Sequence, residues 1–271
     1  NSTTAVFDWE RAAVAGITNG PSGGTGDEIT ETLINETDEP VVVRYVITPS
    51  VNGCEGVPFN LDVTVNPTSE ITSASTANWC NDTENTYEIT SNSTTAVFDW
   101  ERAAVAGITN GPSGGTGDEI TETLINDTDE PVVVRYIITP SVNGCEGVPF
   151  NLDVTVNPTS EITSASTANW CNDTENTYEI TSASSTATFE WVREAVTGIT
   201  NPRVEGSGDE ITETLVNNTD EPVVVRYVIT PSVNGCEGVP FNLDVTVNPT
   251  SEITSASTAN WCNDTENTYE I

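Results

Sequence analysis

Hydrophobic and polar residues alternate along several short segments of the 271-residue chain, and this spacing predicts β-strands. In PVVVRYIIT one face carries apolar residues: Val132, Val134, Tyr136 and Ile138. Residues 86–90 and the segments AVFDWER, EITETLIN and FNLDVTV alternate in the same way. Asn143-Gly144, between PVVVRYIIT and FNLDVTV, is the most common two-residue hairpin signal. Because no long helical stretch interrupts these segments, the pattern predicts an all-β fold, an antiparallel β-sandwich.

The pattern recurs with a period of 91 residues, because the segment that starts at Asn1 starts again at Asn92. The first two copies differ only at Glu36/Asp127 and Val46/Ile137. The third copy differs mainly where FEWVREAVTGITNPRVEGSGDE replaces FDWERAAVAGITNGPSGGTGDE. A period near 90 is too long for a solenoid repeat and favours a tandem array of independent domains.

Proline-containing linkers with the sequence VNPTSEITSAST predict the domain limits. They place whole domains at residues 68–158 and 159–249, the back strands of a partial domain at 1–67, and the front strands of a further domain at 250–271. The two partial pieces complement each other in length. We therefore expect the sequence to be part of a longer tandem array, arranged as a rod.

Composition excludes several classes of function. The chain has 42 acidic residues against 7 basic ones, which are all arginine, and a formal net charge of −35. This charge repels phosphate backbones, so we expect no nucleic-acid partner. Without His or Lys, the usual hydrolase triads, imidazole metal sites and Schiff bases cannot form. No apolar run approaches the roughly 18 residues of a membrane span. We expect neither an enzyme nor a membrane span.

Each period contains two cysteines, one in NWCNDTENTYEI and one in SVNGCEG. With the boundary at the prolines, Cys80 would pair with Cys145 and Cys171 with Cys236, leaving Cys54 and Cys262 unpaired. The alternative scheme crosses the linkers: Cys54 with Cys80, Cys145 with Cys171, and Cys236 with Cys262. Cysteines spread evenly through so acidic a chain indicate an oxidising compartment. Two cysteines and no histidine per domain cannot complete a zinc shell.

The order of motifs resembles a known family. A cysteine precedes a tyrosine-containing strand, followed by FDWERAAVAGITN, GTGDEITETLIN, EPVVVRY, TPSVNGC and PFNLDVTVNP. This resembles the PKD-like, immunoglobulin-like repeats of very large surface proteins of the Bacteroidota. The resemblance implies strings of such domains in gliding-motility adhesins that the type IX secretion system exports. It supplies no catalytic residues.

Three polar segments are candidates for ligand binding. The loop Gly20–Glu28 is rich in glycine, but it lacks a G-K-[ST] sequence, and its acidic end would repel phosphate, so we interpret it as a flexible loop between strands. The acidic clusters Asn81–Asn85 and Glu36–Glu39 contain carboxylate and amide oxygens of the kind that bind Ca²⁺. Their spacing matches no EF-hand loop. We therefore predict a solvated acidic surface and no cofactor, with Ca²⁺ as the alternative.

Tryptophan and arginine recur at fixed positions. Trp9, Trp100 and Trp191 are predicted in the core, whereas Trp79, Trp170 and Trp261 either pack inside the domain or form an exposed platform for sugars. Arginines are expected to pair with carboxylates: Arg11, Arg102 and Arg193 after the core tryptophan, and Arg44, Arg135 and Arg226 on the outward face. Glu31 and its equivalents point inward and are the candidate partners.

These observations predict an extracellular structural module without catalysis, which forms the stalk or fibre of a long surface adhesin or filament. Its expected partners are neighbouring repeats of the same chain, with lateral or end-to-end association into a fibre. Two alternatives stay open. One is a carbohydrate-binding module that uses exposed aromatic residues. The other is a polymer subunit in which residues 250–271 complete the next subunit by strand donation.

Overall fold

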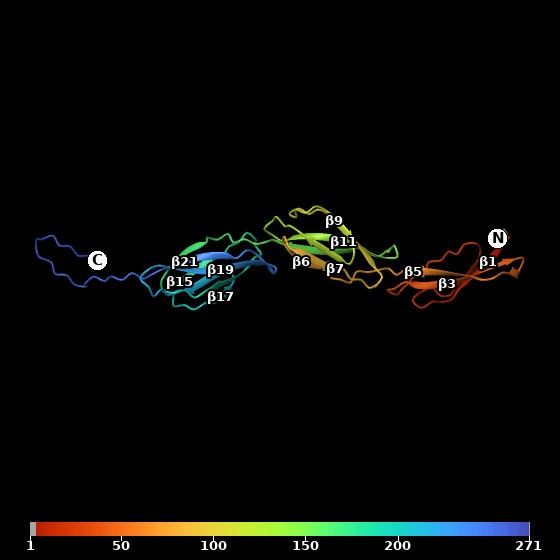
Figure 1. Ribbon diagram of the computed structural model, residues 1–271, viewed down its shortest axis with the longest axis horizontal. Coiled ribbons are helices and arrows are strands. Elements are labelled where there is room, and N and C mark those ends of the chain that lie inside the picture. The colour runs from red at the N-terminus through yellow and green to blue at the C-terminus, as the bar shows by residue number, and fades with distance from the viewer. Residues whose placement is uncertain (1–3, 271) are drawn as a thin grey trace. The chain divides into compact units, whose positions relative to one another are not determined.

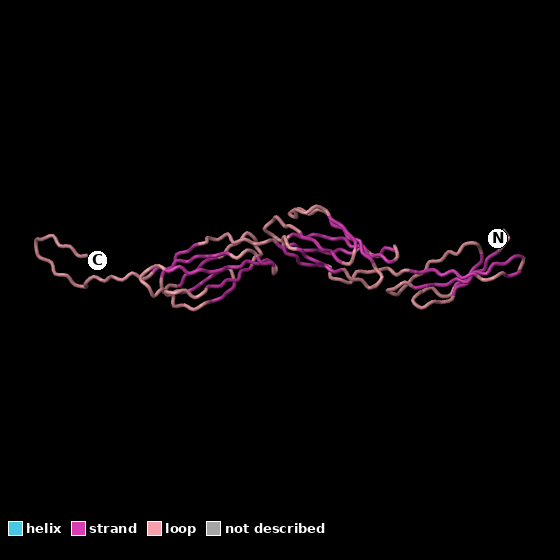
Figure 2. The backbone as a smooth tube through the Cα atoms, in the orientation of Figure 1, coloured by secondary structure: helices cyan, strands magenta, loops and turns pink. Residues whose placement is uncertain are grey.

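The computed structural model describes residues 4–270, which divide into two compact units, residues 4–157 and 158–270. All regular secondary structure in the described residues is β-strand (Figure 2). The first unit contains a partial domain followed by a complete one. The second unit contains a complete domain, followed by a segment that forms no strand over residues 250–270.

The complete domain of the first unit is built from eight strands in two sheets (Figure 1). The strands are β6 (Thr76–Cys80), β7 (Glu84–Glu88), β8 (Val97–Arg102), β9 (Ser113–Thr116), β10 (Glu119–Thr123), β11 (Val132–Val142), β12 (Cys145–Glu146) and β13 (Phe150–Asn157). The larger sheet has the order β6-β13-β11-β8-β9, with β12 paired to β11, and the smaller sheet pairs β7 with β10. Only β6 and β13 run parallel to each other; the other pairs are antiparallel.

The two sheets enclose the core, as the alternation predicts. Ile120 and Leu124 from the smaller sheet and its following loop are fully buried against Tyr136, Leu152 and Val154 of the larger sheet. The predicted hairpin is also confirmed, because Asn143 and Gly144 both have positive φ angles, 49° and 82°. Both central residues of a type I′ turn need this conformation, which explains the Asn-Gly pair. The predicted all-β sandwich is thus confirmed.

The second unit repeats this architecture around its own core. Its strands are β14 (Thr167–Cys171), β15 (Glu175–Glu179), β16 (Thr188–Arg193), β17 (Val204–Ser207), β18 (Glu210–Thr214), β19 (Val223–Val233), β20 (Cys236–Glu237) and β21 (Phe241–Asn248). The order β14-β21-β19-β16-β17 and the pair β15-β18 match the first complete domain strand for strand. Its core is a separate cluster that includes Trp170, Ile211 and Tyr227. Each complete domain therefore has a core of its own.

The partial domain contains one sheet and a small core. Its strands are β1 (Val6–Arg11), β2 (Ser22–Thr25), β3 (Val41–Val51), β4 (Cys54–Glu55) and β5 (Phe59–Val65). They follow the order β2-β1-β3-β4, and β5 also pairs with β3. Its cluster of buried residues contains only Ile17, Val43 and Tyr45. Counterparts of β6 and β7 do not occur within residues 4–67, and residues 28–32, which correspond to β10, form no strand.

The interpretation of Gly20–Glu28 as a flexible loop is wrong. Ser22–Thr25 forms strand β2, which pairs with β1, and the next repeat does the same with β9 and β8. The glycines are needed for packing: a Cβ atom on Gly115 would lie 2.8 Å from the Trp100 ring. The third repeat keeps this glycine as Gly206, below Trp191, although it replaces other glycines of the loop.

Candidate functional site

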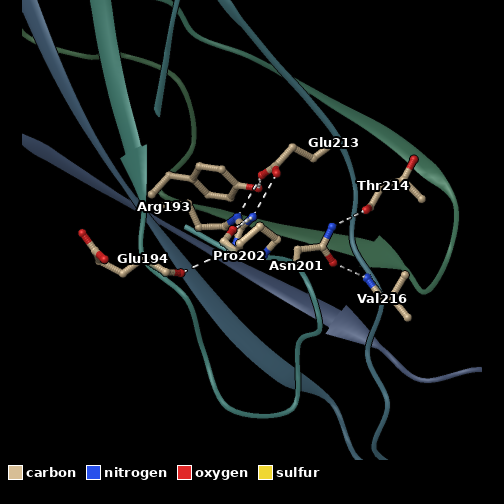
Figure 3. Close-up of polar contacts among 8 residues, drawn as sticks. Arg193, Glu194, Asn201, Pro202, Glu213, Thr214 and Val216 are labelled. Atoms are coloured by element: carbon tan, nitrogen blue, oxygen red, sulfur yellow. Dashed lines mark hydrogen bonds and ion pairs between the residues drawn. The ribbon is translucent and has the colours of Figure 1, made fainter. Parts of the chain in front are cut away.

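A buried arginine, glutamate and tyrosine meet inside each of the three domains. In the last domain Arg193 on β16 is fully buried, and its Nε and Nη2 atoms donate hydrogen bonds of 2.9 and 3.0 Å to the carboxylate of Glu213 (Figure 3). The hydroxyl of Tyr227 on β19 donates to the same carboxylate. Arg193 Nη2 also donates to the carbonyl of Pro202 at 2.9 Å. The hydrogen-bonding groups of Arg193 and Glu213 therefore find their partners within the domain.

The equivalent groups in the first unit have the same geometry. Arg102 Nε lies 2.8 Å from Glu122 Oε2, and the Tyr136 hydroxyl donates to that oxygen at 2.5 Å. In the partial domain Arg11 Nε lies 2.9 Å from Glu31 Oε2. The prediction that Glu31 and its equivalents face inward and pair with these arginines is confirmed. Alternation explains it, since Glu122 lies between the buried residues of the smaller sheet.

The electrostatics of these groups follow from their contacts. The hydrogen bond from Arg11 lowers the pKa of Glu31 to about 2. Burial by itself raises the pKa of Glu122, but the hydrogen bonds from Arg102 and Tyr136 outweigh it, so that the pKa is lowered. Burial, reinforced by the hydrogen bond to Glu122, raises the pKa of Tyr136. A general acid or base needs a pKa near the working pH, and these shifts lead away from it. The arrangement is that of a structural ion pair.

The outward arginines pair across neighbouring strands, as predicted. Arg135 Nε lies 2.7 Å from Asp153 Oδ1, and the pairs Arg44–Asp62 and Arg226–Asp244 repeat this contact at 2.6 and 2.7 Å. These side chains are largely exposed, so water screens each pair and it contributes little to stability. Arg203, in the divergent loop of the third repeat, pairs with Glu194 at 2.9 Å.

The joint between the partial and the complete domain of the first unit is a second site built from polar residues. Thr94 donates from its backbone N–H and its hydroxyl to Glu39 Oε1, at 2.8 and 2.6 Å. Asn92 Nδ2 donates to Asp38 Oδ1 at 2.6 Å. The hydrogen bonds from Thr94 lower the pKa of Glu39. The acidic cluster predicted as solvated surface is therefore partly engaged by the next domain.

On the same joint, the linker contacts the β11–β12 hairpin. Asn66 Nδ2 donates to Cys145 Sγ at 3.3 Å, and Asn143 Nδ2 donates to Asn66 Oδ1 at 2.9 Å. Ser69 is fully buried, and a Cβ atom on Gly147 would lie 2.1 Å from its carbonyl oxygen. Glycine is thus required where the linker crosses the hairpin. Nothing in the sequence indicated these contacts, because they join residues of two different repeats.

The predicted disulfides within domains are wrong. Cys145 and Cys171 are free cysteines, so neither Cys80–Cys145 nor Cys171–Cys236 forms. The sheet explains why: Cys80 lies opposite Asn157 near the start of β11, whereas Cys145 lies opposite Val142 at its other end. Ten residues of strand separate these positions by roughly 33 Å. Disulfide geometry requires Cα atoms within about 7 Å.

The alternative scheme across the linkers is contradicted as well, since Cys54 and Cys262 are also free. Cys80, at the end of β6, is part of a disulfide, and the same holds for Cys236, in β20. Cys145 and Cys262, by contrast, are exposed thiols.

The tryptophans before the strand-end cysteines are buried where their strand is paired. Trp79 and Trp170 are 3% and 4% exposed and pack on Tyr136 and Tyr227. This confirms packing inside the domain for Trp79 and Trp170, whereas Trp261, in the segment that forms no strand, is 64% exposed. Trp100 and Trp191 are half-buried against the cores, as predicted. No group of three or more His, Cys, Asp and Glu residues is placed to hold a metal ion within residues 4–270.

A family model for the PKD-like domain matches three stretches of the chain, residues 1–69, 77–160 and 168–251. The chain belongs to the PKD-like domain family. Each match contains one buried arginine–glutamate pair, so the three PKD-like domains share this structural centre. No curated protein matches the sequence.

Several solved structures are similar to these PKD-like domains at low sequence identity. The I67–I69 fragment of the titin I-band is 10% identical, with a TM-score of 0.38, and covers 92% of this chain and 89% of its own. The FN1–FN3 domains of chicken CNTN1 are 9% identical, with a TM-score of 0.39 and coverages of 90% and 89%. Three N-terminal domains of the bacteriophage RB49 Hoc protein are 8% identical, with a TM-score of 0.44 and coverages of 92% and 89%.

The described residues include no helix of the length and apolar character needed to cross a membrane. The domain limits at residues 68–158 and 159–249 stay a prediction.

Proposed function

We propose that these PKD-like domains form the stalk or fibre of a long extracellular protein and that they carry no catalysis. The observation that carries the proposal is the joint of the first unit. There, consecutive domains keep separate cores and are held by hydrogen bonds between fixed residues, Glu39 with Thr94 and Asn66 with the hairpin of the next domain. Repeating such a joint adds length without merging the domains.

The physical properties of the surface agree with this role. The longest strands have eleven residues, and a rise of about 3.3 Å per residue makes every domain long in the direction of its strands. A net charge of −35 keeps neighbouring fibres apart at close approach, within the Debye length of about 8 Å in physiological salt. The resemblance to surface adhesins of the Bacteroidota extends the proposal to export by type IX secretion and a place on the cell surface.

The mass of the intact polypeptide and electron microscopy of the native material test the proposal together. We expect a denatured chain far heavier than 28.8 kDa and an elongated particle with regularly spaced domains. A compact particle on the cell exterior, or the same protein recovered from the cytoplasm, would contradict it.

A further inference from the structure

The outer face of the sheet edge formed by β16 and β17 is where the third repeat differs most from the second. Along β16 every inward residue equals its counterpart on β8, whereas every outward residue differs. The outward replacements are Val97 by Thr188, Asp99 by Glu190, and Glu101 by Val192. On β17 the inward Gly206 is kept, while its neighbour Glu205 replaces Gly114. The buried core residues are the same in both complete domains, so the divergence lies on a surface.

A hollow of about 500 Å³ lies on this diverged surface. Its lining comes from β16, β17 and β19 and the loop before β17, and includes Glu190, Val192, Arg203, Glu205, Val228 and Thr230. A second hollow of about 420 Å³ shares Glu190 and Ser207 with the first. We name the two hollows together the β16–β17 groove.

Strand pairing fixes the arrangement of the groove. Val192 lies opposite Val228 on β19. In the neighbouring outward row, Glu190 lies opposite Thr230 on one side and opposite Ser207 on the other. Directly opposed residues of paired strands share a face of the sheet. The groove therefore has a floor of two valines next to a carboxylate that is flanked by two hydroxyl groups.

Glu190 is the unneutralised charge of the groove. Arg203 pairs with Glu194 at 2.9 Å and also with Glu205, so these two carboxylates already have a cationic partner. The side chain of Glu190 is exposed and has no hydrogen bond or ion pair within residues 4–270. A cationic group that enters the groove thus meets a carboxylate that no residue of the domain neutralises.

The second repeat lacks the apolar floor. There Glu101 lies opposite Ile137, at the place that Val192 takes opposite Val228. Glu101 is exposed, whereas Val192 is half-buried. An aliphatic chain would therefore meet apolar side chains on two strands in the third repeat and on one strand in the second.

We propose that the β16–β17 groove binds a lysine or arginine side chain from an extended basic segment of a partner protein. The aliphatic stem of that side chain lies on the valine floor, and its cationic head reaches Glu190. Charge-assisted hydrogen bonds to a carboxylate are about twice as strong as neutral ones. The hydroxyls of Thr230 and Ser207 accept the remaining N–H donors. This goes beyond the stalk function, because it gives one domain of the stalk a partner.

The edge of the sheet accounts for the extended form of the partner. β17 is the last strand in the order β14-β21-β19-β16-β17, so its outer edge pairs with no strand within residues 158–270. An extended segment adds to such an edge through backbone hydrogen bonds. Val204 and Glu205 replace Ser113 and Gly114 of β9, and the loss of a glycine favours a strand. Two strand spacings, about 10 Å, then separate the added segment from β16, a span that a long basic side chain and Glu190 bridge together.

The chemistry of the chain shows that the partner is a different protein. The chain has no lysine, and each of its seven arginines already pairs with a carboxylate. It therefore offers no basic segment of its own. Two copies with a net charge of −35 each also repel each other.

The 271-residue chain is titrated with a ten-residue peptide that alternates lysine and valine, and the dissociation constant is measured by fluorescence anisotropy. We expect Glu190→Gln to weaken binding about tenfold, because the charged acceptor is lost. Asp99→Asn is the matched control. It removes the same charge at the equivalent position of the second repeat, so it should change the dissociation constant by less than about twofold.

A second variant separates binding in the groove from general attraction between charges. Val192→Glu restores the residue of the second repeat and adds a negative charge. General attraction would then bind the cationic peptide more tightly, whereas loss of the apolar floor should weaken binding about fivefold. Both variants change an outward residue, and circular dichroism checks that they keep the fold. In the wild type, NMR should show peptide-dependent shifts for the amides of residues 190–192 and 203–207.

Equal losses for Glu190→Gln and Asp99→Asn would overturn the proposal, and so would tighter binding by Val192→Glu. It would also fail if Ca²⁺ alone, or a higher concentration of the chain alone, shifts these amides while the peptide does not. None of these results affects the stalk function, which the mass of the native polypeptide tests separately.

Discussion

Residues 4–66 and 95–157 share one sequence apart from two positions, yet they differ in structure. In the complete domain, residues 119–123 form β10 and Leu152 is fully buried. In the partial domain, residues 28–32 form no strand and Leu61 is partly exposed. The difference between the two regions is the presence of β6 and β7 in the complete domain.

The comparison shows which parts of this fold are local. The β1–β3–β5 sheet and the Arg11–Glu31 pair form without the front strands, because their partners all lie within residues 4–66. Strand β10 has no partner except β7, so its residues lose their strand when β7 is missing. A β-strand with a strong sequence pattern thus still depends on a partner that lies far away in the sequence.

The largest loss of stability is expected when the tryptophan of the front strand β6 is replaced. Trp79→Ala removes a buried ring from the complete domain and should lower its free energy of unfolding by about 3–5 kcal/mol. Trp261→Ala, at the equivalent exposed position, should change the free energy of unfolding very little in reducing buffer at low concentration. Hydrogen exchange of peptides that contain Ile137 measures the complete domain alone, since the other repeats have valine there. Equal effects of the two substitutions would contradict the comparison.

Substitutions in the back strand, β13 in the complete domain and β5 in the partial one, should show the same difference in stability between the two domains, but a smaller one. Leu152→Ala should cost about 2–5 kcal/mol, because it opens a cavity in a closed core. Leu61→Ala removes a partly exposed side chain, so its cost should stay below about 1 kcal/mol. Urea unfolding followed by circular dichroism compares the two variants. If both lose the same stability, the partial domain is covered in solution.

The buried ion pair should respond to pH. Glu31→Gln leaves Arg11 with a weaker partner and should destabilise the partial domain by about 1–3 kcal/mol at pH 7. The pKa of Glu31 is lowered to about 2, below that of an unfolded glutamate near 4.3. The stabilisation is therefore fully present above about pH 4.3 and is lost as the pH falls through 2.

Unfolding measured for wild type and Glu31→Gln between pH 7 and pH 2 tests this prediction. The stability difference between them should shrink in the acidic range. The matched variant corrects for other carboxylates, whose protonation relieves repulsion in this acidic chain. A difference that stays constant down to pH 2 would show that the charge of Glu31 does not contribute.

The smallest effect is expected on the outer face. Asp153→Asn and Asp62→Asn each break an exposed pair with arginine that water already screens, so each should lower the melting temperature only slightly and by less than Glu31→Gln does. The two values should also agree, because this face does not touch the missing strands. Thermal unfolding at low and high salt measures both. A much larger cost at Asp62 would show that the open edge also weakens the outer pairs.

Much of the fold could be predicted from the sequence. Alternation located the long strands and their inward faces, the Asn143-Gly144 turn, and the inward position of Glu31 and its equivalents. It missed Thr76–Cys80 as a strand, and it treated the glycines near Trp100 as loop residues. In both segments, small or polar residues lie in strands because of the neighbours they pack against. A search for alternating apolar and polar residues does not detect such strands.

The cysteines show where inference from sequence fails. Their spacing within one period is compatible with pairing inside a domain, yet the ladder places Cys80 and Cys145 at opposite ends of the sheet. Only the strand register contains that information.

By itself, the sequence determined what is local or periodic: the repeat of 91 residues, the acidic surface, the strand pattern and the hairpin turn. The tertiary structure alone decided which strands obtain a partner, which cysteines lie at which end, and how Asn66 and Glu39 meet the next domain. The physical reason is that strand pairing and burial depend on segments distant in the chain, whereas alternation and turn chemistry depend on a few neighbouring residues.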